Sequence, residues 1–417
     1  MTIRHKKRLT EFCICILLVL LIGLSYLTFG RGRTYLRAAA LLQRIADGHG
    51  GGAIARYDQH AVDELLTAIP TSEGSVAARL YVPRGVANPP GMVIVHGVHH
   101  LGIEEPRLVA FSRAISSSGI VVLTPELKDV ADYHVSQAAI STIGAAARTL
   151  HDRTGHRKVG VMGLSFSGGL SLLAAADPRF SDFIGFLVSV GGHDDLSRVC
   201  QFFATDKIAH PDGTVEALKA HEYGALVLVY SHPEDFFSAQ DLPAARDALR
   251  LQLWEDDKGS RAAAAKLGPA GRQKMGLLLA HNKEALADEL LRCVNRNQKN
   301  MLAVSPHGNL AGLHVPVLLL HGSGDTVIPA SETLWLEKEV PVPWLRAALI
   351  TPVLTHVDVG GSPPLKDKLA LVAFISEMLG QADTCARNRQ SPERANEVTT
   401  AGKYQAAKDG GYLGHAR

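Results

Sequence analysis

Short, uninterrupted runs of apolar residues constrain this sequence most, because they recur between segments that have helical spacing. The runs at 92–95, 120–123 and 159–162 lack the polar alternation of a half-exposed strand and are typical of strands buried on both faces of a sheet. Segments with helical periodicity lie between them, at 108–116 and 138–151. Strands that alternate with helices imply right-handed crossovers and a mostly parallel sheet with helices on both faces. The sequence therefore predicts an α/β fold.

The same alternation continues later in the chain, after one long interruption. Further strands are expected at 78–82, 183–190, 317–320 and 347–350, and a final amphipathic helix at 365–379. The interruption covers residues 196–312, which contain helical segments at 243–254 and 283–297. An insertion of this length is too long for a plain loop, so we expect a helical cap over one end of the sheet. The core is then expected to comprise residues 75–195 and 313–380.

The N-terminus carries an uncharged apolar run at 12–29 that follows four basic residues. Eighteen helical residues span about 27 Å, close to the hydrocarbon thickness of a bilayer. A buried core helix would show a polar face, and a cleaved signal peptide would have a shorter run with a small-x-small site. We expect residues 1–30 to form an uncleaved transmembrane signal anchor that crosses once and leaves the remaining chain outside the cytoplasm. Residues 31–74, with a glycine cluster at 48–52, are expected to be a linker and lead-in, and residues 381–417 a disordered tail.

The composition argues against several kinds of protein. Forty-three Lys and Arg against 41 Asp and Glu leave a net charge of +2, so a strongly basic surface for nucleic acid is not expected. Five cysteines in 417 residues argue against a disulfide scaffold, and their spacing matches no structural zinc site. His96, His99 and His100 have no carboxylate or cysteine with ligand spacing beside them. We therefore expect neither a metal nor a cofactor.

One motif indicates a nucleophile. The strand at 159–162 runs into Gly163-Leu164-Ser165-Phe166-Ser167, and small residues then open a helix. A serine at such a turn stands clear of the sheet, and the N-terminus of the following helix favours developing negative charge. The pattern resembles the nucleophile elbow, Gly-x-Ser-x-Gly, of the α/β-hydrolase superfamily. It differs at Ser167, which stands where a second glycine is usual.

Two further positions agree with this resemblance. An HGxxDxxxP string containing Asp325 follows the strand at 317–320, where the superfamily places its triad acid. His356 follows the next strand and precedes the final helix, where the superfamily carries its general base. The chain order Ser165, Asp325, His356 is that of the α/β-hydrolases and differs from the chymotrypsin and subtilisin orders.

The resemblance also implies the remaining parts of the site. The backbone N–H groups of Val98 and Phe166 would form the oxyanion hole. Asp194 and Asp195, after the strand at 183–190, are rival triad acids, because some members of the superfamily take the acid from that strand. Their surroundings lack the HGxxDxxxP string.

The resemblance covers residues 75–380 and implies an α/β-hydrolase fold with an inserted cap. Tyr81-Val82-Pro83 and the HGxxDxxxP string are similar to dienelactone-hydrolase-like and prolyl-oligopeptidase-like members. The expected function is a membrane-anchored serine hydrolase that cleaves small-molecule or lipid-like carboxylic esters through an acyl-enzyme, with peptidase and acyltransferase as variants. The alternative is a catalytically silent hydrolase-fold protein that binds a partner or lipid.

Overall fold

An eight-stranded sheet forms the centre of the computed structural model, which describes residues 31–47, 52–354 and 364–387. In spatial order the strands are β1 (Val62–Thr71), β2 (Gly74–Pro83), β4 (Val121–Pro125), β3 (Gly91–Val95), β5 (Val159–Leu164), β6 (Ile184–Val190), β9 (Val317–Gly322) and β10 (Leu345–Thr351). The pairs β1–β2 and β2–β4 are antiparallel, and all other neighbours in this sheet are parallel. The predicted mostly parallel α/β sheet is confirmed.

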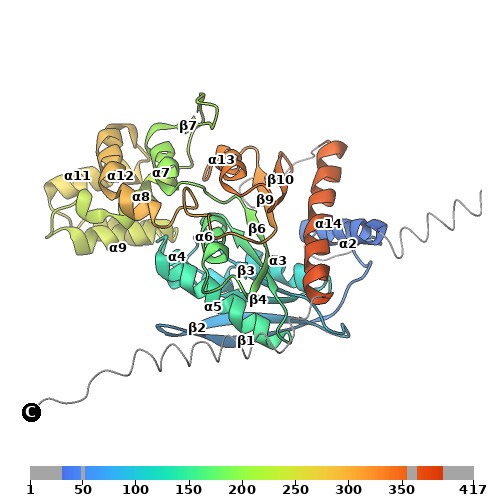
Figure 1. Ribbon diagram of the computed structural model, residues 1–417. Helices are drawn as coiled ribbons and strands as arrows, with labels where there is room; N and C mark the ends of the chain where they lie inside the picture. The colour runs from blue at the N-terminus through green and yellow to red at the C-terminus, as the bar shows by residue number, and fades with distance from the viewer. Residues whose placement is uncertain (1–30, 48–51, 355–363, 388–417) are drawn as a thin grey trace, which may run out of the picture.

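Helices cover both faces of this sheet (Figure 1). One face packs against α5 (Gln137–Arg153) and α6 (Phe166–Ala176), and the other against α3 (Pro106–Ser116) and α14 (Leu365–Arg387). Every residue of β3 and β4 is buried as a result. This double burial is the physical reason for the continuous apolar runs in the sequence. The shorter core helices are η1 (Gly102–Glu104), α4 (Lys128–Ala131) and α13 (Ser331–Glu339).

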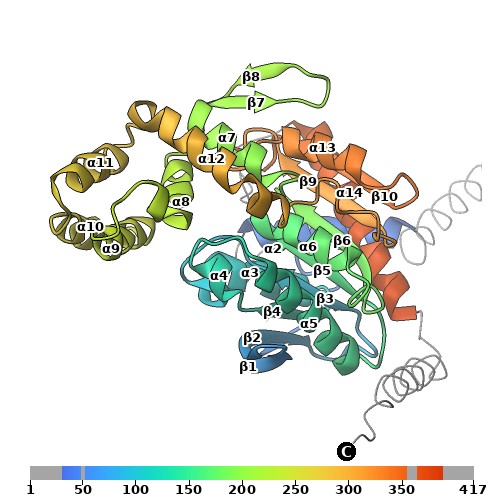
Figure 2. The same cartoon turned by 60° about the vertical axis from the view of Figure 1, so that its left-hand side comes forward.

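A second group of helices stands beside the sheet, and the chain enters it after β6 and leaves it before β9 (Figure 2). Its members are α7 (Leu196–Thr205), α8 (Tyr223–Ser231), η2 (Pro233–Asp235), α9 (Leu242–Leu253), α10 (Asp257–Ala264), α11 (Pro269–Leu279), η3 (Glu284–Leu286) and α12 (Ala287–Leu302). A short hairpin of β7 (Lys207–Ala209) and β8 (Val215–Ala217), which the sequence pattern did not predict, follows α7. We call residues 196–312 the cap. Its α8 is buried over seven consecutive residues, so it forms the centre of the cap.

The expected linker at 31–74 is wrong as a description of this segment. Most of its first part is a helix, α2 (Arg31–Asp47), whose Ala38 and Leu41 are fully buried in the same apolar cluster as α14. The later part supplies β1, an edge strand of the sheet. Its mixed burial explains why no continuous apolar run marks it. The core therefore begins well before residue 75.

The expected boundary of the disordered tail is also wrong. Residues 381–387 continue α14, and Ala382 and Cys385 are buried. Asp383 on the same turns forms an ion pair of 2.7 Å with Arg37 of α2. These contacts hold the last helical turns against the core, which a count of large apolar residues does not reveal.

Among the described residues, one helix is long and apolar enough to cross a membrane by length and composition, and this is α14. It packs against the sheet and α2 in this structure, so it is a helix of the core. The expected signal anchor at 1–30 lies outside the described residues, and so does most of the glycine cluster at 48–52.

Candidate active site

Ser165 occupies the turn between β5 and α6, as the sequence motif predicts. Its backbone has φ 56° and ψ −135°, a conformation that a residue with a side chain rarely adopts and that is costly to hold. The turn is held in place because the Ser165 N–H donates to the carbonyl of Val190 at the end of β6, at 2.8 Å. Such strain at a strand-to-helix turn is the geometry of a nucleophile elbow.

Two glycines leave room for this turn, Gly163 within it and Gly97 in the neighbouring loop after β3. A Cβ at Gly163 would lie 2.2 Å from the carbonyl oxygen of Ser167, and a Cβ at Gly97 would lie 3.0 Å from the Cβ of Ser165. Any larger residue at Gly163 would therefore push the turn apart. The close approach at Gly97 brings the loop after β3 directly beside the serine.

Ser167 has a structural partner that accounts for the departure from the usual motif. Its hydroxyl donates to the carbonyl of His96 at 2.6 Å, and the residue is fully buried. This hydrogen bond joins the elbow after β5 to the loop after β3. A glycine at this position could not make it.

His96 is a structural residue of this loop. Its Nε2 accepts from the N–H of Leu127 at 3.0 Å, which leaves Nδ1–H to donate to the carbonyl of Gly97 at 2.8 Å. Burial lowers the pKa of His96, so the ring is neutral at physiological pH. Both nitrogens are occupied, which argues against metal binding.

His99 and His100, which follow His96 in the loop after β3, lie next to the cap. His99 stacks on His100 with ring centroids 4.8 Å apart, and His100 contacts Trp254 of the cap. The groups of described residues with metal-ligand proximity are His151–Asp152–His156 and Asp194–His307–Glu339, and neither includes these histidines.

The predicted oxyanion donors lie on either side of the elbow. Val98 belongs to the loop after β3 and lines the same cavity as Ser165. Phe166 is the first residue of α6, where backbone N–H groups have no partner within the helix. The two N–H groups remain predicted donors for a developing oxyanion.

Asp325 is buried just beyond the carboxyl end of β9. Its Oδ1 accepts from the N–H groups of Val327 and Ile328, at 2.8 and 3.0 Å. These donors fix the carboxylate in a tight turn next to the carboxyl end of β9.

His321 is the described histidine that forms an ion-pair contact with Asp325, at 3.4 Å between Nε2 and Oδ2. It is fully buried, with Nε2 2.8 Å from the carbonyl of Ile328 and Nδ1 2.7 Å from the hydroxyl of Thr333. Both nitrogens are occupied, so His321 braces the turn and is not a candidate general base. His356, the predicted base, lies outside the described residues, and its role stays a prediction.

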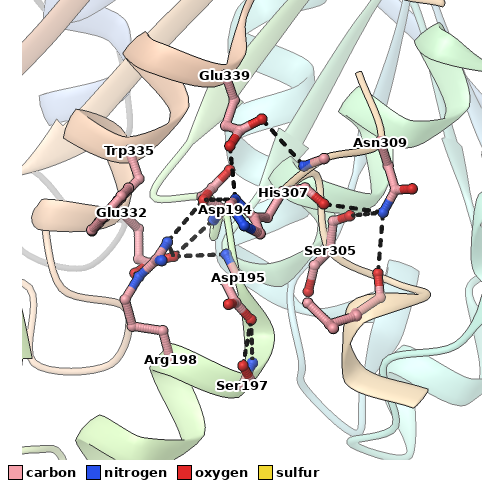
Figure 3. Close-up of polar contacts among 12 residues, drawn as sticks. Asp194, Asp195, Ser197, Arg198, Ser305, His307, Asn309, Glu332, Trp335 and Glu339 are labelled. Carbon is pink, nitrogen blue, oxygen red and sulfur yellow. Dashed lines mark hydrogen bonds and ion pairs between the residues drawn. The ribbon is translucent and has the colours of Figure 1, made fainter. Parts of the chain in front are cut away.

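The rival acids have other partners in the structure (Figure 3). Asp194 Oδ2 lies 2.8 Å from Nη2 of Arg198, which belongs to α7. Nε of Arg198 lies 2.6 Å from Oε1 of Glu332 in α13. Asp195 caps α7, because its Oδ1 accepts from the N–H of Ser197 at 2.8 Å. The choice of Asp325 as the triad acid stays a prediction.

The buried charges around Asp194 join the cap to the core. The N–H groups of Asp194 and Asp195 both donate to Glu332 at 2.9 Å. The chain leaves the cap at His307, whose ring Nδ1 lies 2.7 Å from Oε1 of Glu339. The backbone N–H of His307 donates to the carbonyl of Asp194 at 3.0 Å. Burial raises the pKa of Asp194 to about 7 despite Arg198. We call Asp194, Arg198, His307, Glu332 and Glu339 the cap-base cluster.

A cavity of about 1390 Å³ connects Ser165 with the cap. Core residues His96, Gly97 and Val98 line it together with cap residues, among them Tyr223 and Leu226 of α8. Sequence reasoning missed these cap residues, because no motif marks them. The one signal in this part of the sequence is the apolar run at 225–230. It indicates burial and does not indicate which side chain lines the cavity.

Comparison with known proteins gives a likeness of fold. No family model and no curated protein matches the chain. Among solved structures, it is similar to the esterase domain of a Rhodothermus marinus protein, with 14% identity over 76% of this chain and 96% of that chain and a TM-score of 0.39. A Pyrobaculum calidifontis esterase shows 17% identity over 84% and 92%, with a TM-score of 0.40.

Pyrococcus horikoshii acylaminoacyl peptidase is also similar, with 11% identity over 81% of this chain and a TM-score of 0.44. This chain spans 44% of the length of that peptidase. All three TM-scores lie below 0.5, so we base the function on the geometry of the site.

Proposed function

We propose that this protein is a serine hydrolase that cleaves carboxylic esters with Ser165 as nucleophile, His356 as general base and Asp325 as triad acid. The observation that carries the proposal is the strained backbone of Ser165, held between β5 and α6 at the wall of a large cavity. Strain of this kind persists only where the surrounding structure enforces it. A turn serine without a role would not require it.

The proposed mechanism follows from the chemistry of these groups. The hydroxyl of Ser165 attacks the ester carbonyl while His356 accepts its proton, and Asp325 orients the imidazole and stabilises its charged form. The N–H groups of Val98 and Phe166 stabilise the oxyanion of the tetrahedral intermediate. The protonated imidazole then gives its proton to the departing alkoxide, and an acyl-enzyme remains. Water hydrolyses the acyl-enzyme by the same steps.

Labelling with a fluorophosphonate probe, together with a panel of ester substrates, tests this proposal. Ser165→Ala should abolish labelling and turnover, and Asp325→Asn should lower turnover by about 10⁴-fold. Asp194→Asn serves as the matched control and should stay active. A labelled Ser165→Ala variant, or a wild type without labelling or turnover on any ester, would contradict the proposal and favour a silent binding protein.

We also propose that residues 12–29 anchor the protein in a membrane with the hydrolase domain outside the cytoplasm. The run is uncharged and long enough to cross. Because α2 begins at Arg31 and packs on α14, the domain would be held close to the bilayer surface. Alkaline phosphatase fused after Gly52 should be active and sediment with membranes, whereas an inactive fusion or a soluble, shortened product would contradict the anchor or its orientation.

A further inference from the structure

We propose that the hydroxyl of Tyr223, supplied by the cap, is a further catalytic group that donates a hydrogen bond to the leaving-group oxygen of the ester. The inference rests on the proposed function and adds a contact that no motif of the sequence indicates. Tyr223 is the first residue of α8 and lines the cavity that also contains Ser165. It is therefore a cap side chain that borders the same cavity as the proposed nucleophile.

The backbone before Tyr223 is fastened to the loop that carries the acid. His221 donates its N–H to the carbonyl of Thr326 at 2.8 Å, and Thr326 directly follows Asp325. The rings of His221 and Tyr223 are 4.8 Å apart, and the Tyr223 N–H lies 3.4 Å from the His221 Nδ1. The next seven residues of α8 are buried. Tyr223 is thus held by a rigid helix at one end and by the acid loop at the other.

The hydroxyl of Tyr223 is available to a ligand. Within the described part of the chain it makes no hydrogen bond. Burial raises its pKa, and the charge of Asp325 raises it further. The group therefore stays protonated and acts as a donor over the working pH range. An ester bound in the cavity can therefore accept a hydrogen bond from this hydroxyl.

The order of the strands indicates which substrate oxygen it meets. The oxyanion loop follows β3 and the acid loop follows β9, and these two strands lie on opposite sides of β5. The leaving-group oxygen must face the base that protonates it, and that base pairs with the acid. Tyr223 approaches from the acid loop, so its hydroxyl meets the alcohol side of the ester and leaves the carbonyl to Val98 and Phe166. It stabilises the negative charge that grows as the C–O bond breaks and keeps its own proton.

The test compares two esters of the same acid that differ only in the alcohol. An ethyl ester has a poor leaving group that needs stabilisation, whereas a p-nitrophenyl ester has a good one. Tyr223→Phe should lower kcat/KM for the ethyl ester by about 10- to 100-fold, the range expected for a lost hydrogen bond to a charged oxygen. The kcat/KM for the p-nitrophenyl ester and the rate of fluorophosphonate labelling should stay within about threefold of wild type, which also shows that the variant is folded.

Tyr133→Phe is the matched control. Tyr133 lines the same cavity, but its hydroxyl already donates to the carbonyl of Leu253 at 2.8 Å. Any loss in this variant should be equal for the two esters, because the hydroxyl has no part in the departure of the alcohol.

Two results would overturn the assignment of Tyr223. Equal losses on both esters would place the hydroxyl at the carbonyl oxygen, and an unchanged ethyl ester rate would show that it does not contact substrate. Failure of the proposed function looks different, because the wild type itself would then neither react with the probe nor cleave either ester.

Discussion

The residue that departs from the usual nucleophile motif is also a residue that organises the site. Ser167 donates to the carbonyl of His96, so the elbow and the oxyanion loop are joined at one point. The link holds the loop that contains Val98, a predicted oxyanion donor, next to the turn of Ser165. A small displacement of an oxyanion donor is expensive, because each such donor contributes about 3 kcal/mol of transition-state stabilisation.

Ser167→Ala should therefore reduce activity without removing the nucleophile. Loss of the hydroxyl leaves the buried His96 carbonyl without this donor, which costs about 1–3 kcal/mol of stability. We expect kcat/KM for esters to fall about tenfold while the fluorophosphonate probe still labels Ser165. Steady-state kinetics and urea unfolding measure the two effects.

Ser171→Ala provides the comparison on the same helix. Ser171 is equally buried, but its hydroxyl has no hydrogen-bond partner among the described residues. Its removal should therefore leave both stability and kcat/KM nearly unchanged. Equal effects of the two substitutions would show that the link from Ser167 to His96 has no role in catalysis.

At the scale of elements, the contact between α2 and α14 ties the two ends of the described chain together. Leu41 of α2 is fully buried in the cluster that contains α14, and Arg37 reaches Asp383 near the end of α14. Residues 31–47 were expected to belong to a linker, and the helix that covers their apolar face lies more than 300 residues further along the chain. Periodicity identifies which face of a helix is apolar and does not identify what covers it.

Leu41→Ala should destabilise the whole domain by about 2–5 kcal/mol, the usual cost of truncating a buried leucine. Tyr35→Ala on the same helix should cost little, because Tyr35 is 43% exposed. Chemical unfolding of the two variants beside wild type measures the difference. If α2 were a detached linker, the two substitutions would have equally small effects.

For the molecule as a whole, the sequence predicted the parts of the sheet that are buried on both faces. Continuous apolar runs marked β3, β4, β5 and β9 because these strands are buried on both faces of the sheet. The elbow at Ser165 followed from the same logic, since glycine and serine at the end of such a strand indicate a tight turn. These features are local, and local sequence determines them.

The features that the sequence did not predict depend on contacts between distant segments. The edge strand β1 is partly exposed and has no apolar run. The cap-base cluster joins Asp194 with His307 and Glu332, which lie more than 100 positions further along the chain. Tyr223 reaches the site only because α8 is docked on the loop after β9. No local sequence pattern predicts such contacts, because they form only when the cap packs against the core.

The cap-base cluster should make stability depend on pH. The pKa of Asp194 is raised to about 7 by burial, with Glu332 and Glu339 adding to the effect and Arg198 opposing it. In the unfolded chain an aspartate has a pKa of about 3.9. Its protonated form therefore stabilises the fold fully below about pH 4, and this contribution is lost as the pH rises through about 7.

Asp194→Asn cannot titrate, so the wild type should lose free energy of unfolding relative to this variant between pH 5 and pH 8. Urea unfolding of both proteins across this range measures the change. Asp195→Asn is the control and should follow the wild type, because asparagine also caps a helix N-terminus. A difference between wild type and Asp194→Asn that stays constant with pH would contradict the raised pKa.

The cap-base cluster also shows that the chain leaves and rejoins the core at neighbouring points. The N–H of His307 donates to the carbonyl of Asp194 at 3.0 Å, and the N–H of Leu196 donates to the hydroxyl of Ser305 at 2.9 Å. The chain of segment 196–312 therefore enters and leaves the core at two neighbouring points, as the chain of an inserted module does. A change in its length or its replacement by another set of helices would leave β6 and β9 paired as before. Substrate preference can thus diverge through exchange of the module while the sheet that holds Ser165 stays the same.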